Sequence, residues 1–332
     1  MVDKKPTVIS TFAGCGGSSL GYHMAGFKEL LAVEWEQNAV DTFRLNFPDV
    51  PVYHGDIAKL TGAECMKLAG IVPRELDVFD GSPPCQGFST AGKRKFDDPR
   101  NSLFKEYARL LSELQPKCFV MENVTGMVKG CMKQAYLQII KTLRGCGYKA
   151  KGQVLNAMYY GVPQSRQRVI IIGVREDIVI EPSHPKPQTK PICCGTIKSV
   201  SMPCLKHSDR VAALWHKLKP GMNGSDLPES KGNAFGLQKI DPRKPCPTIL
   251  KGWTAGTGLL HWNECRFISI PEMAQIASFG IGFKFSGVPV QAVERIGNSV
   301  PPLLMKAIAE HIKVNILGAA PTVTLQNDES VQ

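Results

Sequence analysis

The chain lacks the segments that mark membrane-spanning and secreted proteins. No run of about 18 uncharged apolar residues occurs in its 332 residues, so no transmembrane helix is predicted. Residues 1–6 include two lysines and lead straight into the apolar run at 7–10, without the apolar core of a signal peptide. We therefore expect a cytoplasmic protein.

The chain also lacks paired cysteine spacings. Its 11 cysteines form no CxxC pair, and the adjacent Cys193 and Cys194 suit neither a zinc knuckle nor an easy disulfide. We expect free thiols in a reducing compartment and no bound metal.

Positive charge is concentrated in one region. The net charge is +11, and residues 184–266 hold thirteen lysines and arginines against five acidic residues. Such a concentration suits contact with a phosphate backbone. Charge alone would equally suit a solvated, solubilising face.

Apolar runs and helical patterns alternate along the first half of the chain. The expected strands share short apolar runs, at 8–12, 30–33, 52–54, 78–79, 118–121 and 169–174. Helical spacing separates them, at 18–25, 38–47, 102–114 and 132–143. This order predicts an α/β fold with a doubly wound sheet, and the run at 169–174, β-branched except for Gly173, predicts a fully buried strand.

The pattern changes after residue 180. Residues 181–191 are proline-rich, and 192–265 are irregular, glycine-rich and basic, which predicts a small domain of strands and loops. Helical spacing returns at 271, with a helix expected over 302–316. We predict a first domain over 1–180, a second over 181–270, a return to the first over 271–316, and a disordered tail over 317–332.

The most informative motif surrounds Cys85. Residues 81–89 are Gly-Ser-Pro-Pro-Cys-Gln-Gly-Phe-Ser, directly after a predicted strand. This places a thiol on a proline-stiffened loop at a strand's carboxyl end, where open α/β sheets carry their chemistry. The thiolate is the reactive form of cysteine, so Cys85 is a candidate nucleophile. A small buried hydrophobe is the ordinary alternative, which the length of the motif disfavours.

A second group of residues suits an adenosine-shaped ligand. Four glycines lie within residues 12–21, between a predicted strand and helix, where a backbone turn can approach a ligand. The spacing is neither GxGxxG nor a P-loop. Glu34 and Asp56 end the next two strands, where acids suit a ribose diol and an adenine amino group. Trp35 can stack on a purine ring.

A third group lies later in the chain. Glu122 ends the strand after the Cys85 loop, where an acid suits addition of a thiol to a ring, although a solvated strand-end acid is the alternative. Arg166 and Arg168 are two residues apart on a predicted strand, so they point to one face. They can bind phosphate or a carbonyl oxygen, or form ion pairs. Residues 297–302, Gly-Asn-Ser-Val-Pro-Pro, precede a helix, for which a simple N-terminal turn is the alternative.

Taken in order, these motifs resemble those of the DNA (cytosine-5)-methyltransferases. Residues 12–21 resemble the motif that binds S-adenosyl-L-methionine, and 81–89 the Pro-Cys nucleophile motif. Residues 122–124 resemble the acid motif, 164–168 the Gln-x-Arg-x-Arg motif, and 297–302 the final motif. Arg266 with Glu272 resembles the segment after the recognition domain, although Phe-Ile-Ser-Ile-Pro at 267–271 departs from the usual Leu-Thr form.

The resemblance implies a Rossmann-like catalytic and cofactor domain with a small, mostly β and loop target recognition domain. It implies that the catalytic residues are Cys85, Glu122, Arg166 and Arg168. The cofactor contacts that it implies are Phe12, Gly14, Gly16, Gly17, Glu34, Trp35, Asp56, Ile57, Pro84, Leu103, Asn298, Ser299 and Val300. Candidate DNA contacts are Gln86, Ser89, Lys93, Arg94, Arg243, Lys244, Thr248 and Lys251.

The implied reaction is sequence-specific transfer of a methyl group from S-adenosyl-L-methionine to carbon 5 of a cytosine, through a Cys85 adduct at carbon 6. Glu122 would act at ring nitrogen 3 and Arg168 at the ring carbonyl. A stacked base is inaccessible, so the cytosine must be flipped out, and we expect the loop over 86–100 to close over the DNA. The expected partners are double-stranded DNA and, functionally, a restriction endonuclease, with the protein acting as a monomer.

Two alternatives remain open. An RNA cytosine-5 methyltransferase can use the same framework, although the basic insert favours duplex DNA. A DNA-binding protein without catalysis can keep the fold, although Cys85, Glu122 and Arg168 argue against it.

Overall fold

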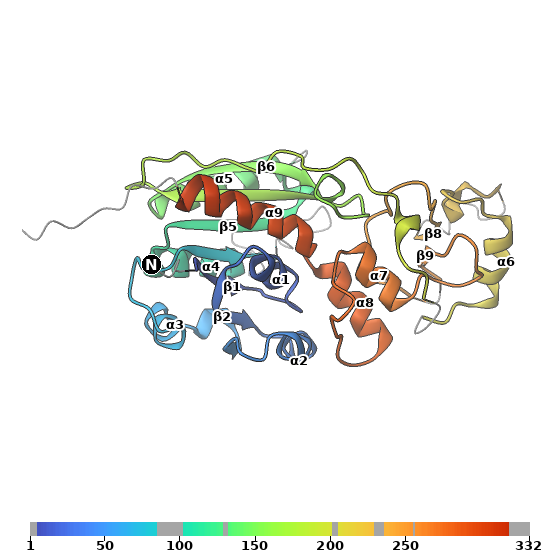
Figure 1. Cartoon of the computed structure of the whole chain (residues 1–332), viewed down its shortest axis with the longest axis horizontal. Helices are drawn as coiled ribbons and strands as arrows, with labels where there is room; N and C mark the ends of the chain where they lie inside the picture. The colour runs from blue at the N-terminus through green and yellow to red at the C-terminus, as the bar shows by residue number, and fades with distance from the viewer. Residues whose placement is uncertain are drawn as a thin grey trace, which may run out of the picture.

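A seven-stranded sheet forms the larger lobe of the computed structural model, which describes residues 5–84, 102–128, 132–200, 205–228, 236–254 and 256–318 (Figure 1). Its strands are β1 (Thr7–Thr11), β2 (Lys28–Glu34), β3 (Val52–His54), β4 (Val78–Gly81), β5 (Cys118–Val124), β6 (Tyr148–Asn156) and β7 (Gln167–Arg175). They lie in the order β3-β2-β1-β4-β5-β7-β6, in which β1 to β5 are parallel and β7 is antiparallel to β5 and β6. The chain order reverses direction between β1 and β4, which creates the switch point of a doubly wound fold.

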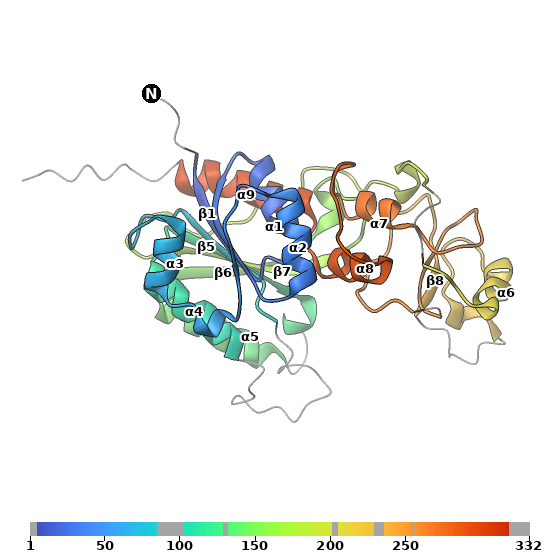
Figure 2. The same cartoon turned by 90° about the horizontal axis from the view of Figure 1, so that it is seen from below.

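Helices cover both faces of this sheet (Figure 2). One face carries α1 (Gly17–Met24), α2 (Gln37–Asn46) and α9 (Pro302–Ile312), and the other carries α3 (Gly62–Ala69), α4 (Ser102–Leu114) and α5 (Lys133–Gly145). Neighbouring residues of a strand enter different cores: Val8 packs in the α1 and α9 cluster, whereas Ile9 packs in the α3, α4 and α5 cluster. Because both faces are buried, the strands are continuous apolar runs. The predicted doubly wound α/β fold is confirmed.

Strand β6 is not among the strands that the sequence predicts. Apolar and polar residues do not alternate regularly along β6, so the sequence gives no clear strand pattern there. Lys151 and Val154 remain exposed because β6 is an edge strand of the sheet. Lysines on an edge strand discourage pairing with other chains. The antiparallel direction of β7 brings Arg168, near its start, to the edge where β4 and β5 end.

The second lobe lies beside the larger one and is built mostly from loops (Figure 1). Two short parallel strands, β8 (Leu237–Lys239) and β9 (Gly258–Leu260), pair within it. It also contains a helix that the sequence analysis does not predict, α6 (Asp209–Lys217), whose first turn is capped by the Ser208 hydroxyl. The predicted domain boundaries at 180 and 270 stay predictions.

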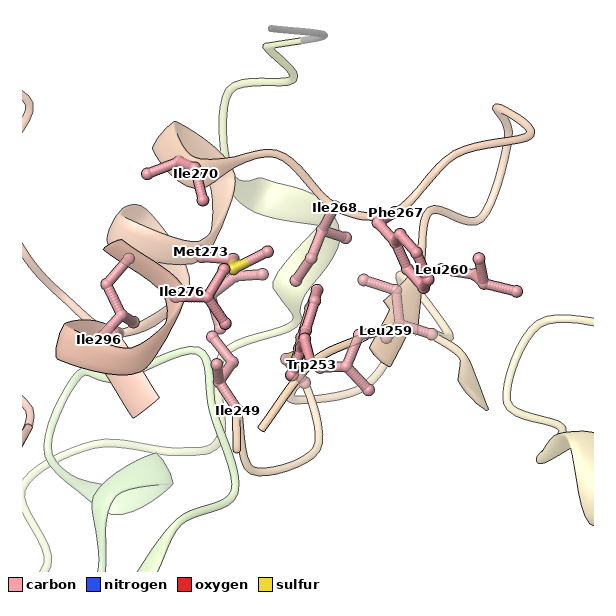
Figure 3. Packing of buried hydrophobic residues seen from close by; sticks show 14 of the residues in the cluster. Ile249, Trp253, Leu259, Leu260, Phe267, Ile268, Ile270, Met273, Ile276 and Ile296 are labelled. Atoms are coloured by element: carbon pink, nitrogen blue, oxygen red, sulfur yellow. The ribbon is translucent and has the colours of Figure 1, made fainter. Parts of the chain in front are cut away.

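The core of the second lobe is continuous with the returning helices. In Figure 3, Trp253, Leu260 and Phe267 pack in one cluster with Met273 of α7 (Ile270–Ile276) and Ile296 of α8 (Pro289–Asn298). The two lobes therefore share buried apolar surface, which opposes free movement between them.

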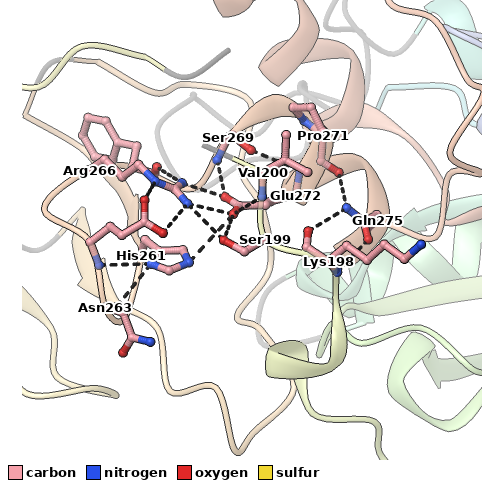
Figure 4. Close-up of polar contacts among 12 residues, drawn as sticks. Lys198, Ser199, Val200, His261, Asn263, Arg266, Ser269, Pro271, Glu272 and Gln275 are labelled. Carbon is pink, nitrogen blue, oxygen red and sulfur yellow. Dashed lines mark hydrogen bonds and ion pairs between the residues drawn. The ribbon is translucent and has the colours of Figure 1, made fainter. Parts of the chain in front are cut away.

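A buried polar cluster links the two chain segments that connect the second lobe to the larger one (Figure 4). This cluster, here called the lobe junction, consists of Ser199, Val200, Arg266, Ser269 and Glu272. The Glu272 carboxylate accepts hydrogen bonds from both terminal nitrogens of Arg266 at 2.8 Å. It also accepts from the backbone of Ser269 at 2.7 Å and of Val200 at 3.0 Å, and from the Ser199 hydroxyl at 3.1 Å. Burial alone would raise the pKa of Glu272, but the hydrogen bonds from Arg266 and then from backbone amides lower it to about 2.

The last helix closes against the first. A Cβ atom placed on Gly21 of α1 would lie 2.6 Å from the Met305 Cβ of α9, so the close contact requires glycine. The helix expected over 302–316 is α9 followed by a π-helical turn at Lys313–Leu317. Residues 319–332 of the predicted tail lie outside the described residues. In the part of the chain that the structure describes, no helix has the length and apolar character to cross a membrane.

Candidate active site

The candidate residues gather at one edge of the sheet, around the switch point. Thr11 at the end of β1 lies opposite both Val33 of β2 and Gly81 of β4, and Gly81 lies opposite Met121 of β5. The residues that follow these positions therefore emerge side by side. Open α/β sheets bind their ligands at such a crevice.

A glycine turn follows β1 and is held by Glu34. Gly14 and Gly16 have φ of 57° and 94°, the left-handed region that favours glycine, and Phe12 enters the turn at φ 53°. The Gly14 amide donates to one Glu34 carboxylate oxygen at 2.8 Å, while the other oxygen accepts from the amides of Trp35 at 2.9 Å and Glu36 at 3.0 Å. Burial raises the pKa of Glu34, although the hydrogen bonds from the Gly14 and Trp35 amides act in the opposite direction. The carboxylate is fixed in place beside the turn.

Two further cofactor candidates flank this carboxylate. The Trp35 side chain is 75% exposed, so its ring face is open to a ligand, which is unusual for tryptophan. Asp56 is exposed at the end of β3 and accepts from the Ala58 amide at 3.0 Å, while its neighbour Ile57 is buried. The structure brings these predicted residues to the same edge as Glu34.

The turn that follows α8 packs on the glycine turn. A Cβ atom on Gly17 would lie 2.5 Å from the Val300 carbonyl oxygen, so no side chain fits there. The Ser299 hydroxyl lies 3.1 Å from the Cys15 thiol and donates to the Arg295 carbonyl at 2.6 Å. Asn298 is exposed beside them. The sequence analysis did not single out Cys15 or Arg295, because a cysteine between glycines and an arginine within a helix carry no local signal of this contact.

An ion pair stands at the neighbouring strand ends. Nε of Arg168 lies 2.8 Å from a Glu122 oxygen, and the two side chains keep 13% and 11% of their surface exposed. The Asn123 amide donates to the Pro83 carbonyl at 2.9 Å and so ties β5 to the segment that leads to Cys85. Asn123 is a third position that the sequence analysis did not single out, although it lies within the acid motif.

The candidate nucleophile lies outside the described residues, as do Gln86, Ser89, Lys93, Arg94 and the predicted closing loop over 86–100. Pro84, exposed, is the last described residue before this stretch. After it, Leu103 of α4 is partly buried against the core cluster that includes Phe104. Pro84, beyond the end of β4, and Leu103, in the first turn of α4, therefore lie on either side of the stretch that contains Cys85.

Arg166 and Arg168 make different contacts. Arg166 is only 2% exposed, and its terminal nitrogens donate to the carbonyl oxygens of Ile249 at 3.1 Å and Gly297 at 2.7 Å. Arg168 instead pairs with Glu122. Strand β7 begins at Gln167, so Arg166 lies just before the strand that carries Arg168, and the two side chains contact separate neighbours.

The candidate DNA contacts of the second lobe divide into exposed and engaged residues. Lys244 and Lys251 are exposed. The Arg243 guanidinium is largely exposed but bound to Asp241 at 3.1 Å, and the Thr248 hydroxyl donates to the Ser165 carbonyl at 2.8 Å. Within the described residues, no group of three or more His, Cys, Asp or Glu side chains is placed to hold a metal ion.

Comparison with known proteins agrees with this geometry. A family model described as C-5 cytosine-specific DNA methylase matches residues 6–210 and 206–314. The type II methyltransferase M1.HphI of Haemophilus parahaemolyticus is 36% identical over 325 residues, covering 92% of this chain and 86% of that protein. M.NgoPII of Neisseria gonorrhoeae is 41% identical over 339 residues, covering 92% and 95%.

Solved structures support the same fold. A prophage-encoded protein of E. coli superposes with a TM-score of 0.77 at 24% identity, covering 94% of this chain and all of that chain. S. pombe Dnmt2 methyltransferase superposes with a TM-score of 0.66 at 16% identity, covering 95% and 99%.

Proposed function

Because the chain belongs to the C-5 cytosine-specific DNA methylase family and is a DNA cytosine methyltransferase, we propose that it methylates carbon 5 of a flipped-out cytosine in a specific duplex sequence. S-adenosyl-L-methionine is the proposed methyl donor, and Cys85 is the proposed nucleophile at carbon 6. One observation carries the proposal: the Glu122–Arg168 pair stands beside the Asn123 contact that anchors the segment leading to Cys85.

The described residues fit the proposed donor. Space is open at Gly14, where a Cβ atom would meet nothing within 4 Å, and the Trp35 ring is exposed beside it. The fixed Glu34 carboxylate can accept from a ribose diol, and the exposed Asp56 from an adenine amino group. When bound, S-adenosyl-L-methionine supplies a methyl group activated by its sulfonium charge.

The chain's own residues carry the remaining chemistry. The Cys85 thiolate forms a bond to carbon 6, which moves an electron pair toward carbon 5 and makes that carbon nucleophilic. A proton shared between Glu122 and ring nitrogen 3, together with the Arg168 guanidinium at the ring carbonyl, stabilises the negative charge that develops on the ring. Once carbon 5 carries the methyl group, with S-adenosyl-L-homocysteine as the other product, removal of the carbon 5 proton by a base and elimination of Cys85 restore the aromatic ring and the free thiolate.

The second lobe is the proposed target recognition domain. Lys244, Lys251 and the largely exposed Arg243 are proposed to contact phosphates, while neighbouring side chains distinguish base edges in the major groove. The similar curated proteins are named type II methyltransferases, so the proposal includes a companion restriction endonuclease as functional partner, with this protein acting as a monomer.

Transfer of a labelled methyl group to mixed-sequence duplex DNA, followed by sequencing that detects 5-methylcytosine, tests the proposal. Methylation in one short recurring context is expected, together with its loss in Cys85→Ala. Cys146→Ser is the matched control, because that thiol lies at the end of α5 and bonds only to backbone carbonyls. Methylation of transfer RNA instead of DNA, or full activity of Cys85→Ala, would refute the proposal.

A further inference from the structure

Arg166 occupies a position that is costly for a charged side chain. It is almost fully buried, its Nε atom has no hydrogen-bond partner among the described residues, and it forms no ion pair with any of them. Burial and then the nearby charge of Arg168 lower the pKa of Arg166 to about 9. A buried charge without an ionic partner carries an uncompensated desolvation cost, so stability alone does not account for this residue.

The segment before Arg166 is joined to the second lobe by a continuous series of contacts, here called the seam (residues 163–166 with 246–249). The Cys246 amide donates to the Pro163 carbonyl at 2.9 Å, and the Ser165 amide donates to the Cys246 carbonyl at 2.8 Å. The Thr248 hydroxyl then bonds the Ser165 carbonyl at 2.8 Å. The Arg166 bond to the Ile249 carbonyl ends the seam.

The second bond of Arg166 reaches the cofactor side. Its acceptor, Gly297, lies two residues before Ser299, whose hydroxyl contacts the glycine turn at Cys15. Gly297 also lies directly against the second lobe, because a Cβ atom there would be 2.6 Å from the Lys251 amide nitrogen. One guanidinium thus bridges the loop that carries Thr248 and Lys251 to the turn that packs on the cofactor residues.

The third neighbour is the ion pair at the strand ends. Arg168 follows two residues later, at the start of β7, where it pairs with Glu122. Arg166 therefore stands where three parts of the proposed site meet: the Glu122–Arg168 pair, the DNA-facing loop over 246–251 and the turn over 297–300.

We propose that Arg166 is a positioning residue for methyl transfer, which aligns the DNA-facing loop and the cofactor-side turn with the Glu122–Arg168 pair. It touches neither substrate, and it acts by fixing two carbonyl groups that otherwise belong to separate lobes. The inference rests on the proposed function and assigns Arg166 a role different from that of Arg168. A misalignment of about 1 Å at a reacting centre can cost on the order of 10²-fold in rate.

The experiment compares Arg166→Met with Arg175→Met. Arg175 is also buried, lies at the far end of β7 and bonds a backbone carbonyl, that of Gln115. Unlike Arg166 it also pairs with Asp177, so it controls for the loss of a buried arginine that is remote from the proposed site. We expect Arg166→Met to lower kcat/KM for duplex DNA by on the order of 10²-fold, and Arg175→Met to leave it unchanged. Affinity for S-adenosyl-L-homocysteine without DNA should stay that of the unsubstituted protein in both.

Two further variants keep the test decisive if Arg166→Met folds poorly. Arg166→Lys can reach only one of the two carbonyl groups, so its kcat/KM should fall between those of Arg166→Met and the unsubstituted protein. Thr248→Val removes a single seam contact and should lower kcat/KM in the same direction. Equal activity of Arg166→Met and Arg175→Met, or an activity loss matched by the unfolded fraction, would overturn the inference.

The inference and the proposed function can fail separately. If the unsubstituted protein methylates no DNA, the proposed function is refuted. Fluorescence anisotropy with labelled duplex DNA then still decides on Arg166, because the positioning role predicts weaker binding for Arg166→Met than for Arg175→Met. Equal affinities would overturn it.

Discussion

Replacing Glu272 with glutamine removes the charge at the centre of the lobe junction while keeping the side chain's shape. The pKa of Glu272 falls from an ordinary 4.5 to about 2 in the folded protein. Each pKa unit corresponds to about 1.4 kcal/mol, so the ionised carboxylate contributes about 3 kcal/mol of stability at neutral pH. Breaking a buried ion pair typically costs 3–5 kcal/mol, which agrees with this figure.

Tryptophan fluorescence offers an assay confined to the second lobe. The chain has four tryptophans, of which Trp215, Trp253 and Trp262 lie in or against the core of that lobe. Replacing Trp35 with phenylalanine leaves only these three as reporters. Urea unfolding in this background should show a loss of about 3 kcal/mol for Glu272→Gln at pH 7. Glu264→Gln is the control, because Glu264 also bonds Arg266 but is half exposed and should cost less than about 1 kcal/mol.

The pH dependence gives an independent check. A carboxyl group whose pKa is depressed on folding stabilises the protein above its unfolded pKa, and this contribution is lost as pH falls through the folded pKa. The contribution of Glu272 should therefore be complete above about pH 5 and disappear toward pH 2, and Glu272→Gln should lack this loss. Parallel pH profiles for the two proteins, or a cost below about 1 kcal/mol at pH 7, would refute the reasoning.

Of three further predictions, two concern ligand binding and one concerns the packing of the glycine turn. Glu34→Ala should weaken affinity for S-adenosyl-L-methionine in calorimetry, because it releases three backbone amides of the cofactor edge, and unchanged affinity would count against the ribose contact. Gly17→Ala should lower the free energy of unfolding by about 1–3 kcal/mol in thermal unfolding, because the added Cβ would meet the Val300 carbonyl. The control Gly126→Ala should not, because the space around Gly126 is open. Equal effects of the two substitutions would contradict the packing argument. Replacing Lys244 and Lys251 with glutamine should reduce the salt dependence of DNA binding by a slope of about 2, and an unaltered slope would exclude both as phosphate contacts.

The sequence predicted the features that depend on local periodicity and strand ends. The run at 169–174, β-branched except for Gly173, falls within β7, because a strand buried on both faces needs no alternation. Glu34 and Glu122 could be placed at one edge because parallel strands bring their carboxyl ends together. These predictions needed no knowledge of distant contacts.

The remaining features depend on contacts between distant residues. Side-chain periodicity is the same in both strand directions, so the antiparallel course of β7 left no trace in the sequence. The partners of Arg166 are 83 and 131 residues away, and no local pattern distinguishes a buried arginine from an exposed one. Helix α6, by contrast, had a usable signal, since Ser208 precedes a run in which Val211, Leu214 and Leu218 share one face.

The contact between α1 and α9 bears on how the protein is made. A ribosome that adds about 5–20 residues per second needs roughly 15–60 s after the glycine turn to reach Pro302. Glu34 and Glu122, which belong to the proposed site, are synthesised long before α9. Until α9 emerges, however, the face of α1 around Gly21 lacks the helix on which it packs. We expect nascent chains and truncations that end before Pro302 to expose this apolar face and to be substrates for chaperones or proteases rather than partly active enzymes.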